Sequence, residues 1–258
     1  MAVQTGWDMS AQAWIDHIGE QGDWGRRCIL DKALLDRIGD REFQRALDVG
    51  CGEGRFCRLL GTRRIAAVGI DPTQRLLDEA RKRDPDGDYR QARAEKLPFP
   101  DDHFDLVVSY VSLIDVEAYQ AAINEMARVL APGGMLLIAN LTSIDTAGER
   151  QGWVVDEDGS KLHWALDRYL EEHPFDFRLV QATTTIVNWH RPLSAYMKAF
   201  LGAGLQLVHF AEPEPHSGEP EEIANYRRMP WFVVMEWTLP SSKPGEVIAD
   251  LRRTRRRL

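Results

Sequence analysis

The sequence predicts a Rossmann-like α/β fold with helices on both faces of a largely parallel sheet. Apolar runs of strand length alternate with apolar stripes at helical spacing between about residues 46 and 141. A glycine-rich turn follows the first of these strands, and an acidic residue, Asp71, ends the second. Because open α/β sheets bind ligands outside the carboxyl ends of their strands, both features predict a site at that edge.

Length and composition fit one globular domain with additions, since the chain has 258 residues, of which 44% are hydrophobic and 28% charged. No apolar run approaches the roughly 18 residues that span a bilayer, and the N-terminus lacks a signal-type region. The three cysteines form no C-x-x-C pair, which argues against a disulfide framework and fits a cytoplasmic location. The net charge of −8 argues against a nucleic-acid partner.

Residues 1–40 are expected to form a helical lid ahead of the first strand. Two apolar stripes at helical spacing, near Trp14–Ile18 and Ile29–Ile38, flank the glycine-containing stretch 22–25. Such helices either pack on the core or cover the site, and the sequence leaves both interpretations open.

The stretch from the first strand, Ala46–Val49, into the helix that begins at Arg55 organises the site. Between them lies G-x-G-x-G, starting at Gly50. This turn is expected to direct backbone N–H groups and a helix N-terminus at a ligand, and glycine lets that ligand approach closely. A dinucleotide fingerprint needs a small residue where Arg55 stands, which argues against a nicotinamide-dependent oxidoreductase.

The following elements come in order. The second strand covers 65–70, and Asp71 behind it either holds a ribose or caps the helix that starts at Pro72. A weak third strand at 88–92, a fourth at 104–110, a helix at 116–130 and a fifth strand at 135–140 follow.

Residues 142–190 break the alternation and are rich in aromatic and charged side chains. Long connections in compact domains are usually functional or disordered, and the aromatic content argues against disorder. We therefore expect a cap over the acceptor, with strand pieces near 177–180 and 183–188; the alternative is an excursion that extends the sheet. A helix at 193–201, a strand at 205–210, a polar loop at 212–228, a last strand at 231–237 and a solvated basic tail at 241–258 complete the chain.

Four motifs in this order resemble those of class I S-adenosylmethionine (SAM) methyltransferases. They are L-D-V-G-C-G-E-G from Leu47, A-E-K-L-P-F from Ala94, F-D-L-V-V from Phe104 and L-A-P-G-G from Leu130. The second is typical of the ubiquinone and menaquinone methyltransferase group. The resemblance covers about residues 41–240 and implies a seven-stranded sheet of order 3-2-1-4-5-7-6 with strand 7 antiparallel. It also implies SAM as cofactor and S-adenosylhomocysteine as product.

The resemblance implies a cofactor site with a defined set of residues. In it Asp71 would hold the ribose, Ala94 and Glu95 would lie against the adenine, and Leu97 would cover it. Arg27 would pair with the SAM carboxylate, unless it forms a surface salt bridge. The full set is Arg27, Asp48, Gly50, Cys51, Gly52, Asp71, Pro72, Ala94, Glu95, Leu97 and Ser109.

Methyl transfer from a sulfonium is an in-line displacement that mainly needs alignment and exclusion of water. A hydroxyl or amine acceptor can require a base, for which histidine is suited. The candidates are His190, where the cap returns to the sheet, and His163 within the cap, each with a hydrogen-bonded structural role as the alternative. Tyr110 could line the methyl-transfer site. No metal site is expected, because the histidines are scattered.

The predicted function is methyl transfer to an oxygen, nitrogen or carbon of a small-molecule acceptor. The fourth strand is not followed by Asn/Asp-Pro-Pro-Tyr, which disfavours an adenine amino group as acceptor. The aromatic cap favours an apolar or ring-containing molecule. A SAM-binding protein without catalysis and an enzyme for protein or RNA remain alternatives, and the sequence leaves open whether the chain forms a homodimer.

Overall fold

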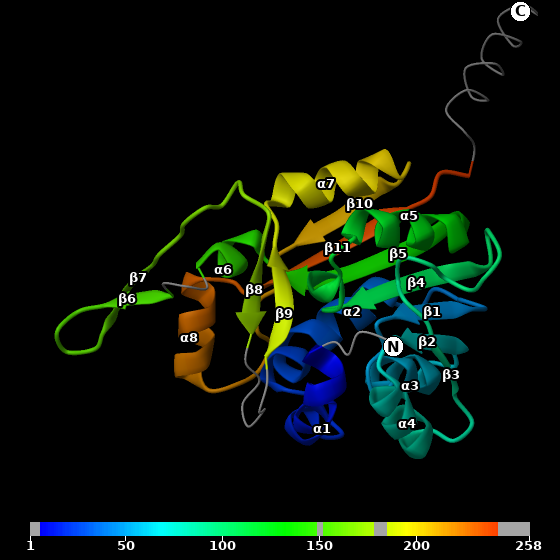
Figure 1. Ribbon diagram of the computed structural model, residues 1–258, viewed down its shortest axis with the longest axis horizontal. Coiled ribbons are helices and arrows are strands. Elements are labelled where there is room, and N and C mark those ends of the chain that lie inside the picture. The colour runs from blue at the N-terminus through cyan, green and yellow to red at the C-terminus, as the bar shows by residue number, and fades with distance from the viewer. Residues whose placement is uncertain (1–5, 149–151, 178–184, 242–258) are drawn as a thin grey trace, which may run out of the picture.

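The computed structural model describes residues 6–148, 152–177 and 185–241, and seven of its strands form one sheet (Figure 1). The order across the sheet is β10-β11-β5-β4-β1-β2-β3. β11 runs antiparallel to β5 and β10, whereas the other neighbours among the first five strands run parallel. This confirms the predicted order with its antiparallel seventh strand. The strands are β1 Ala46–Val49, β2 Ala67–Asp71, β3 Asp88–Gln91, β4 Phe104–Tyr110, β5 Leu130–Leu141, β10 Gln206–Ala211 and β11 Phe232–Thr238.

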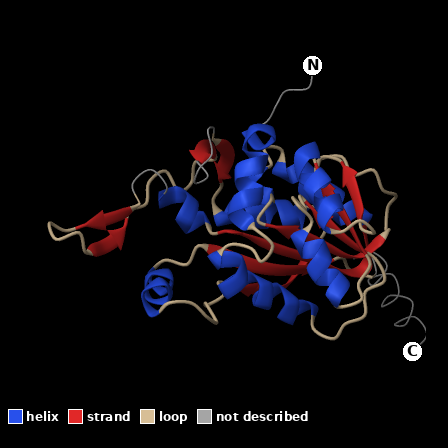
Figure 2. Cartoon of the chain, turned by 90° about the horizontal axis from the view of Figure 1, so that it is seen from below, coloured by secondary structure: helices blue, strands red, loops and turns tan. Residues whose placement is uncertain are grey.

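Helices cover both faces of the sheet (Figure 2). Successive residues of β4 alternate between the two layers, with Val107 in one apolar core and Leu106 and Val108 in the other. A strand buried on both faces reads as a continuous apolar run, which is why the sequence pattern located it. The helices of one layer are α5 Tyr119–Val129 and α7 Leu193–Gly202, and those of the other are α2 Asp31–Ile38, α3 Arg55–Thr62 and α8 Pro220–Arg228.

The N-terminal segment packs on the body of the protein, and its role as a lid stays a prediction. α1 (Gly6–Ile18) packs Ala11 and Ile15 against Leu76 of α4 (Gln74–Arg83) and also lies beside β9 (Ile186–His190). A five-residue π-helix, η1 (Arg26–Leu30), leads into α2. π-helical turns are rare and often occur at functional sites, so the element that carries Arg26 and Arg27 is of interest for the site.

The region after β5 forms small sheets of its own. β6 (Trp153–Val155) and β7 (Lys161–Trp164) form a hairpin that projects from the body of the protein, as Figures 1 and 2 show, and β8 (His173–Phe177) pairs with β9. Within the described ranges neither pair joins the main sheet, so the alternative that this region extends that sheet is wrong. The strand expected near 177–180 falls mostly outside the described residues, and β9 continues two residues beyond the strand expected at 183–188.

The expectation of a polar loop throughout 212–228 is wrong, because α8 occupies its last part. Glu219 and Glu222 form a reciprocal capping box, and Pro220 stands at the start of the helix. Glu221 and Glu222 lie in the first turn and Arg227 and Arg228 in the last, which complements the helix dipole. The cluster of Glu and Pro that indicated a loop therefore includes a helix start. Of the predicted tail, only residue 241 is described.

Candidate active site

The glycine loop after β1 combines close packing with one open position. A Cβ added at Gly50, whose φ is +78°, would lie 2.4 Å from Ser112 Cβ, and one at Gly54 would lie 2.6 Å from the Tyr89 ring. At Gly52, whose φ is +55°, the nearest atom would be Trp14 Nε1 at 3.9 Å. The outer two glycines therefore permit packing against neighbouring segments, whereas the middle one leaves space where a ligand can approach.

Most amides of the loop are used within the protein. The N–H groups of Gly50 and Cys51 donate to Ile70 O at 2.8 and 2.9 Å, and that of Gly52 donates to Asp71 Oδ2 at 3.0 Å. Gly54 N donates to Cys51 O at 2.9 Å. The expectation that these amides face the ligand is therefore wrong. A phosphate site needs free amides, so the loop fits a cofactor without phosphate better than a dinucleotide.

Asp71 holds the glycine loop and the turn before α4, whose N-cap residue is Thr73, so the alternative that Asp71 itself caps this helix is wrong. Its Oδ1 accepts from Thr73 N at 2.8 Å and its Oδ2 from Gly52 N. Each oxygen retains a lone pair that could accept a ribose hydroxyl. Burial raises the pKa of Asp71 to about 6. Pro72 is exposed, and its carbonyl accepts from Gln91 Nε2 at 2.9 Å.

Two further carboxylates at the loop are buried with unsatisfied oxygens. Asp48 is 1% and Glu53 3% exposed, and neither Asp48 Oδ1 nor Glu53 Oε1 has a hydrogen-bond partner among the described residues. Burial raises the pKa of Asp48 to about 7, and the nearby charges of Asp71 and Glu53 add to this effect. Because buried carboxylate oxygens without partners are costly, this site favours a cationic ligand. SAM meets that requirement with its sulfonium and its amino group.

The basic side chain of Arg26 lies near these acids. The Arg26 guanidinium lies 4.8 Å from the Trp14 ring centre and 5.4 Å from that of Tyr110, and it pairs with Asp23 at 2.5 Å. Its charge acts to lower the pKa of Asp48. The Arg27 side chain, in contrast, is exposed. Arg26 is therefore a second candidate partner of the SAM carboxylate, and the contact expected of Arg27 stays a prediction.

The residues expected around the adenine form a tight turn. Ala94 and Leu97 are buried in the apolar core, and Leu97 N donates to Glu125 Oε2 at 2.8 Å. Glu95 is half-buried and pairs with Arg93 at 2.8 Å. Their contact with adenine stays a prediction.

Ser109 and Cys51 support the conformation of the glycine loop. Ser109 Oγ lies 2.8 Å from Ser112 Oγ, which donates to Val49 O at 2.5 Å. This chain of hydroxyls ties the turn after β4 to the end of β1. Burial raises the pKa of the Cys51 thiol, so it stays protonated at neutral pH. Direct contact of either residue with the cofactor stays a prediction.

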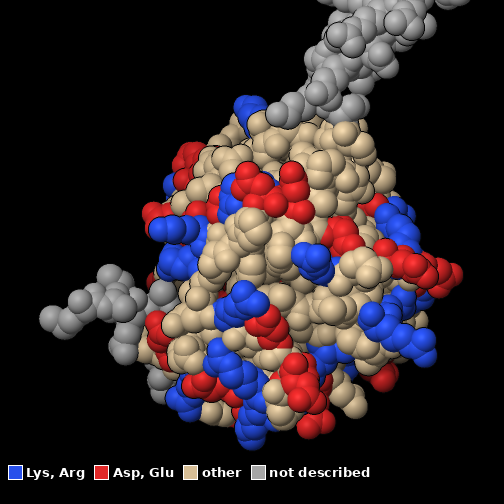
Figure 3. All heavy atoms as spheres, turned by 90° about the vertical axis from the view of Figure 1, so that its right-hand side faces the viewer, with Lys and Arg blue, Asp and Glu red and all other residues tan. Residues whose placement is uncertain are grey.

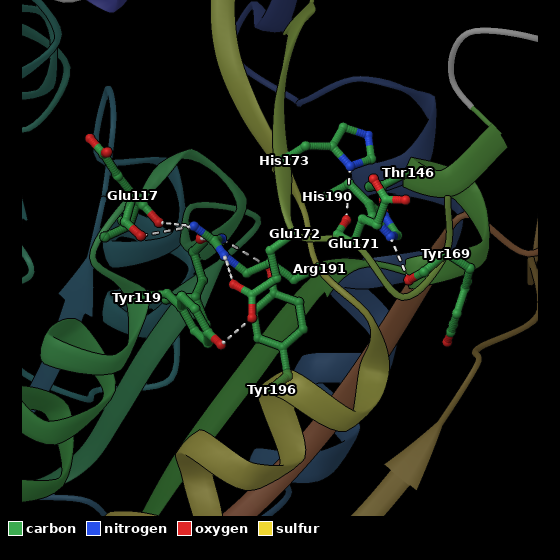
Figure 4. A network of polar contacts seen from close by, with 12 residues as sticks. Glu117, Tyr119, Thr146, Tyr169, Glu171, Glu172, His173, His190, Arg191 and Tyr196 are labelled. Carbon is green, nitrogen blue, oxygen red and sulfur yellow. Dashed lines mark hydrogen bonds and ion pairs between the residues drawn. The ribbon is translucent and has the colours of Figure 1, made fainter. Parts of the chain in front are cut away.

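His190 is buried, and both of its ring nitrogens have partners (Figure 4). Nε2 lies 2.9 Å from Tyr169 O, and Nδ1 lies 2.7 Å from Thr146 Oγ1. A carbonyl only accepts, so Nε2 carries the proton and Nδ1 accepts from Thr146. Burial lowers the pKa of His190, which keeps the ring neutral. These contacts favour the structural alternative for His190 over the role of a base.

The other two catalytic candidates, His163 and Tyr110, also provide no free base at the glycine loop. His163 is exposed on β7, in the projecting hairpin. Tyr110 donates through its hydroxyl to Asp31 Oδ1 at 2.9 Å, and burial raises its pKa well above the ordinary value. Arg55 Nη1 donates to the same oxygen at 2.9 Å. The Tyr110 ring thus lies beneath Arg26 and its hydroxyl is held by Asp31, while its place at the methyl-transfer site stays a prediction.

The sequence analysis missed a polar group on the other side of the loop. Asp115 ends the short helix η2 (Leu113–Asp115) and is half-buried, and Asn188 Nδ2 of β9 donates to its Oδ1. The Trp7 side chain of α1 is a second hydrogen-bonding partner of this carboxylate. Asp115 follows β4, so the rule that placed Asp71 at the site could have found it. Asn188 and Trp7 come from distant segments and gave no signal.

Comparison with known proteins identifies the family. A family described as "Methyltransferase domain" matches residues 47–138. The sequence is 33% identical over 184 residues to a malonyl-[acyl-carrier protein] O-methyltransferase of Enterobacter lignolyticus, covering 69% of this chain and 71% of that protein. It is 36% identical over 140 residues to the ubiquinone/menaquinone biosynthesis C-methyltransferase UbiE of Pseudomonas putida, covering 50% of this chain and 54% of that protein.

A solved structure agrees with these relatives. The S-adenosylmethionine dependent methyltransferase from Mesorhizobium loti matches with a TM-score of 0.70 and 29% identity, over 80% of this chain and 95% of that chain. The open Gly52, the unsatisfied carboxylates and the absence of free loop amides at Gly50, Cys51, Gly52 and Gly54 fit the same cofactor. The chain belongs to the class I SAM-dependent methyltransferases, and SAM is its cofactor.

Proposed function

We propose that this enzyme transfers the methyl group of SAM to an oxygen, nitrogen or carbon of a small-molecule acceptor. The observation that carries the proposal is that two elements of the same chain, α1 and β9, cover the site. Trp14 Nε1 of α1 donates to Glu53 of the glycine loop at 3.4 Å, and Trp7 of α1 contacts Asp115. β9 closes a further side through Asn188. An acceptor that reacts in a site covered by α1 and β9 must be small enough to enter that site.

The chain's own residues have separate tasks in this proposal. Asp71 accepts the ribose hydroxyls, and Asp48 and Glu53 compensate the positive charges of the cofactor. Arg26 pairs with its carboxylate. SAM supplies a methyl group on a sulfonium that carries its own leaving group, so the protein aligns the two reactants and excludes water. The indoles of Trp7 and Trp14, packed edge to face at 5.4 Å, provide the apolar wall that excludes it.

Surface charge and the names of relatives support a small acceptor. Acidic and basic side chains are interspersed on the face drawn in Figure 3, and the net charge is −8, whereas RNA-binding surfaces are strongly basic. The relatives named above include an O-methyltransferase and a C-methyltransferase. The proposal therefore includes oxygen, carbon and nitrogen as atoms that receive the methyl group.

Labelled SAM tests the proposal. The protein is incubated with methyl-labelled SAM and, separately, with the small-molecule, protein and RNA fractions of a bacterial lysate. Label in a small-molecule product is the expected result. Label in the protein or RNA fraction would show that the acceptor is a protein or an RNA and not a small molecule. SAM binding by calorimetry without label in any fraction would indicate a binding protein without catalysis.

A further inference from the structure

The site contains an acid, Asp115, that takes no part in the proposed cofactor contacts. Asp48, Glu53 and Asp71 surround the glycine loop, whereas Asp115 lies beyond β4, between α1 and β9. Of the three candidates for a base, His190 and Tyr110 are bound internally and His163 is exposed on the hairpin. Proton transfer at this end of the site therefore needs another group.

Asp115 is held in a fixed orientation. Asn188 Nδ2 donates to Oδ1, and the Trp7 side chain also bonds the carboxylate. Asp115 N donates to Ser112 O at 3.0 Å, and Ser112 Oγ donates to Val49 O at the end of β1. The carboxylate is thereby coupled by short contacts to the strand that carries the glycine loop.

The charges around Asp115 suit a group that exchanges a proton near neutral pH. Burial raises its pKa to about 8, and the negative charge of Asp71 acts in the same direction. The positive charge of Arg26 and the hydrogen bonds from Trp7 and Asn188 lower it. A base with a pKa near the working pH combines a useful ionised fraction with sufficient basicity.

We propose that Asp115, positioned by Asn188 and Trp7, forms the acceptor subsite and takes up the proton of an acceptor that carries an O–H or N–H group. In this step the O–H or N–H bond breaks and the proton passes to the Asp115 carboxylate. The released electron pair forms the bond to the methyl carbon, and the pair of the methyl–sulfur bond stays on sulfur. This inference rests on the proposed function, and it narrows the acceptor to a hydrogen-bond donor.

The same charges disfavour an acceptor that is a carboxylate. Such an anion would meet Asp115 and the acids of the loop, while Arg26 pairs with Asp23 and is already assigned to the carboxylate of the cofactor. Like charges at short range in a partly buried site repel strongly. A phenol or an amine is neutral or cationic and avoids this repulsion.

The test uses Asp115→Asn, with Glu117→Gln as matched control because Glu117 is an exposed carboxylate on the same loop. Catechol, 2-phenylethylamine and phenylacetate, together with any small-molecule fraction that wild type labels, serve as acceptors for labelled SAM. We expect methylation of catechol or the amine and none of phenylacetate. Asp115→Asn should lower kcat at least about 100-fold and abolish its rise with pH, while the Kd for S-adenosylhomocysteine stays within about twofold. Glu117→Gln should match wild type.

Three results would overturn the inference. They are an Asp115→Asn variant with kcat within about threefold of wild type, a preference for phenylacetate, and a parallel loss of S-adenosylhomocysteine binding and folding, which would make Asp115 structural. If wild type labels no small molecule at all, the proposed function fails first, and this inference fails with it. Because S-adenosylhomocysteine binding is measured on both variants, failure of the proposed function can be distinguished from loss of the cofactor site.

Discussion

Asp71 Oδ2 accepts the amide of Gly52 at 3.0 Å, so the acid at the end of β2 holds the open position of the glycine loop. The other oxygen of the same carboxylate accepts from the amide of Thr73, the N-cap residue of α4. One side chain therefore couples the first two strands of the sheet at the cofactor edge. Because both contacts use backbone amides, they do not depend on neighbouring side chains.

This coupling makes Asp71→Ala costly for both binding and folding. We expect SAM affinity to fall by roughly 1.5–3 kcal/mol, the range for hydrogen bonds to a charged group, and the unfolding temperature to fall as well. Calorimetry and thermal unfolding measure the two effects. Asp78→Ala, at an exposed position on α4, is the control and should change neither. Loss of stability with unchanged SAM affinity would reduce Asp71 to a residue that only holds the loop and the turn before α4.

Substitutions at Gly50 and Gly52 should separate folding from binding. Gly50→Ala places a Cβ against Ser112 and should destabilise the fold. Gly52→Val costs strain at a positive φ but meets open space, so the folded protein should persist and lose SAM binding. Circular dichroism and calorimetry on both variants check this. A Gly52→Val protein that binds SAM like wild type would contradict the assignment of the cofactor position.

His190→Ala should act mainly on stability. The ring bridges Thr146 of α6 (Ser143–Gly148) and the carbonyl of Tyr169, and its removal leaves the buried Thr146 hydroxyl and this partly buried carbonyl without their partner (Figure 4). We expect a loss of about 1–3 kcal/mol in the free energy of unfolding, while kcat of the folded fraction stays within about threefold. Denaturant titration and turnover at low temperature measure both. A large fall in kcat at unchanged stability would restore His190 as a base.

The sheet was predictable because each strand carries its own signal. β4 is a continuous apolar run, and the strand expected at 104–110 matches its bounds. The order of the strands came from the resemblance to a known family, since no local pattern contains it. α8 was missed because a Glu- and Pro-rich stretch predicts a loop as readily as a helix start, and only the reciprocal bonds of Glu219 and Glu222 distinguish them.

The site was less predictable, because its members are brought together by tertiary contacts. Asp71 and the glycines follow strands and could be located. Arg26 faces Trp14 and Tyr110 whereas Arg27 is exposed, and no periodicity in the sequence distinguishes these two neighbours. Asn188 meets Asp115 across 73 positions of sequence, and no periodicity predicts that pair.

Arg26→Ala and Arg27→Ala form a matched pair for the cofactor carboxylate. Arg26 faces Trp14 and Tyr110, whereas Arg27 is exposed, so Arg26→Ala should weaken S-adenosylhomocysteine binding by roughly 1.5–3 kcal/mol and Arg27→Ala should have little effect. Methylthioadenosine lacks the amino-acid part, so its affinity should be equal in both variants. If Arg26→Ala weakened both ligands equally, Arg26 would be a packing residue and not a partner of the carboxylate.

The buried acids also make stability depend on pH. The pKa values of Asp48 and Asp115 are raised to about 7 and about 8, whereas a carboxyl of the unfolded chain titrates near ~3.9. The folded protein therefore binds more protons than the unfolded chain, and its stability falls as pH rises through these values. Between pH 6.5 and 8.5 the loss should be on the order of 1–3 kcal/mol in the absence of ligand.

Below about pH 6.5 the lowered pKa of His190 acts in the opposite direction, because its neutral ring must be protonated on unfolding, so the test belongs above that value. Thermal unfolding at fixed ionic strength should show a falling transition temperature in wild type and a flatter dependence in Asp48→Asn and Asp115→Asn.

Over the same range SAM should bind more tightly as pH rises, since ionised acids then meet its positive charge. S-adenosylhomocysteine lacks the sulfonium and should gain less; an equal gain for both ligands would exclude the sulfonium as the partner of these carboxylates.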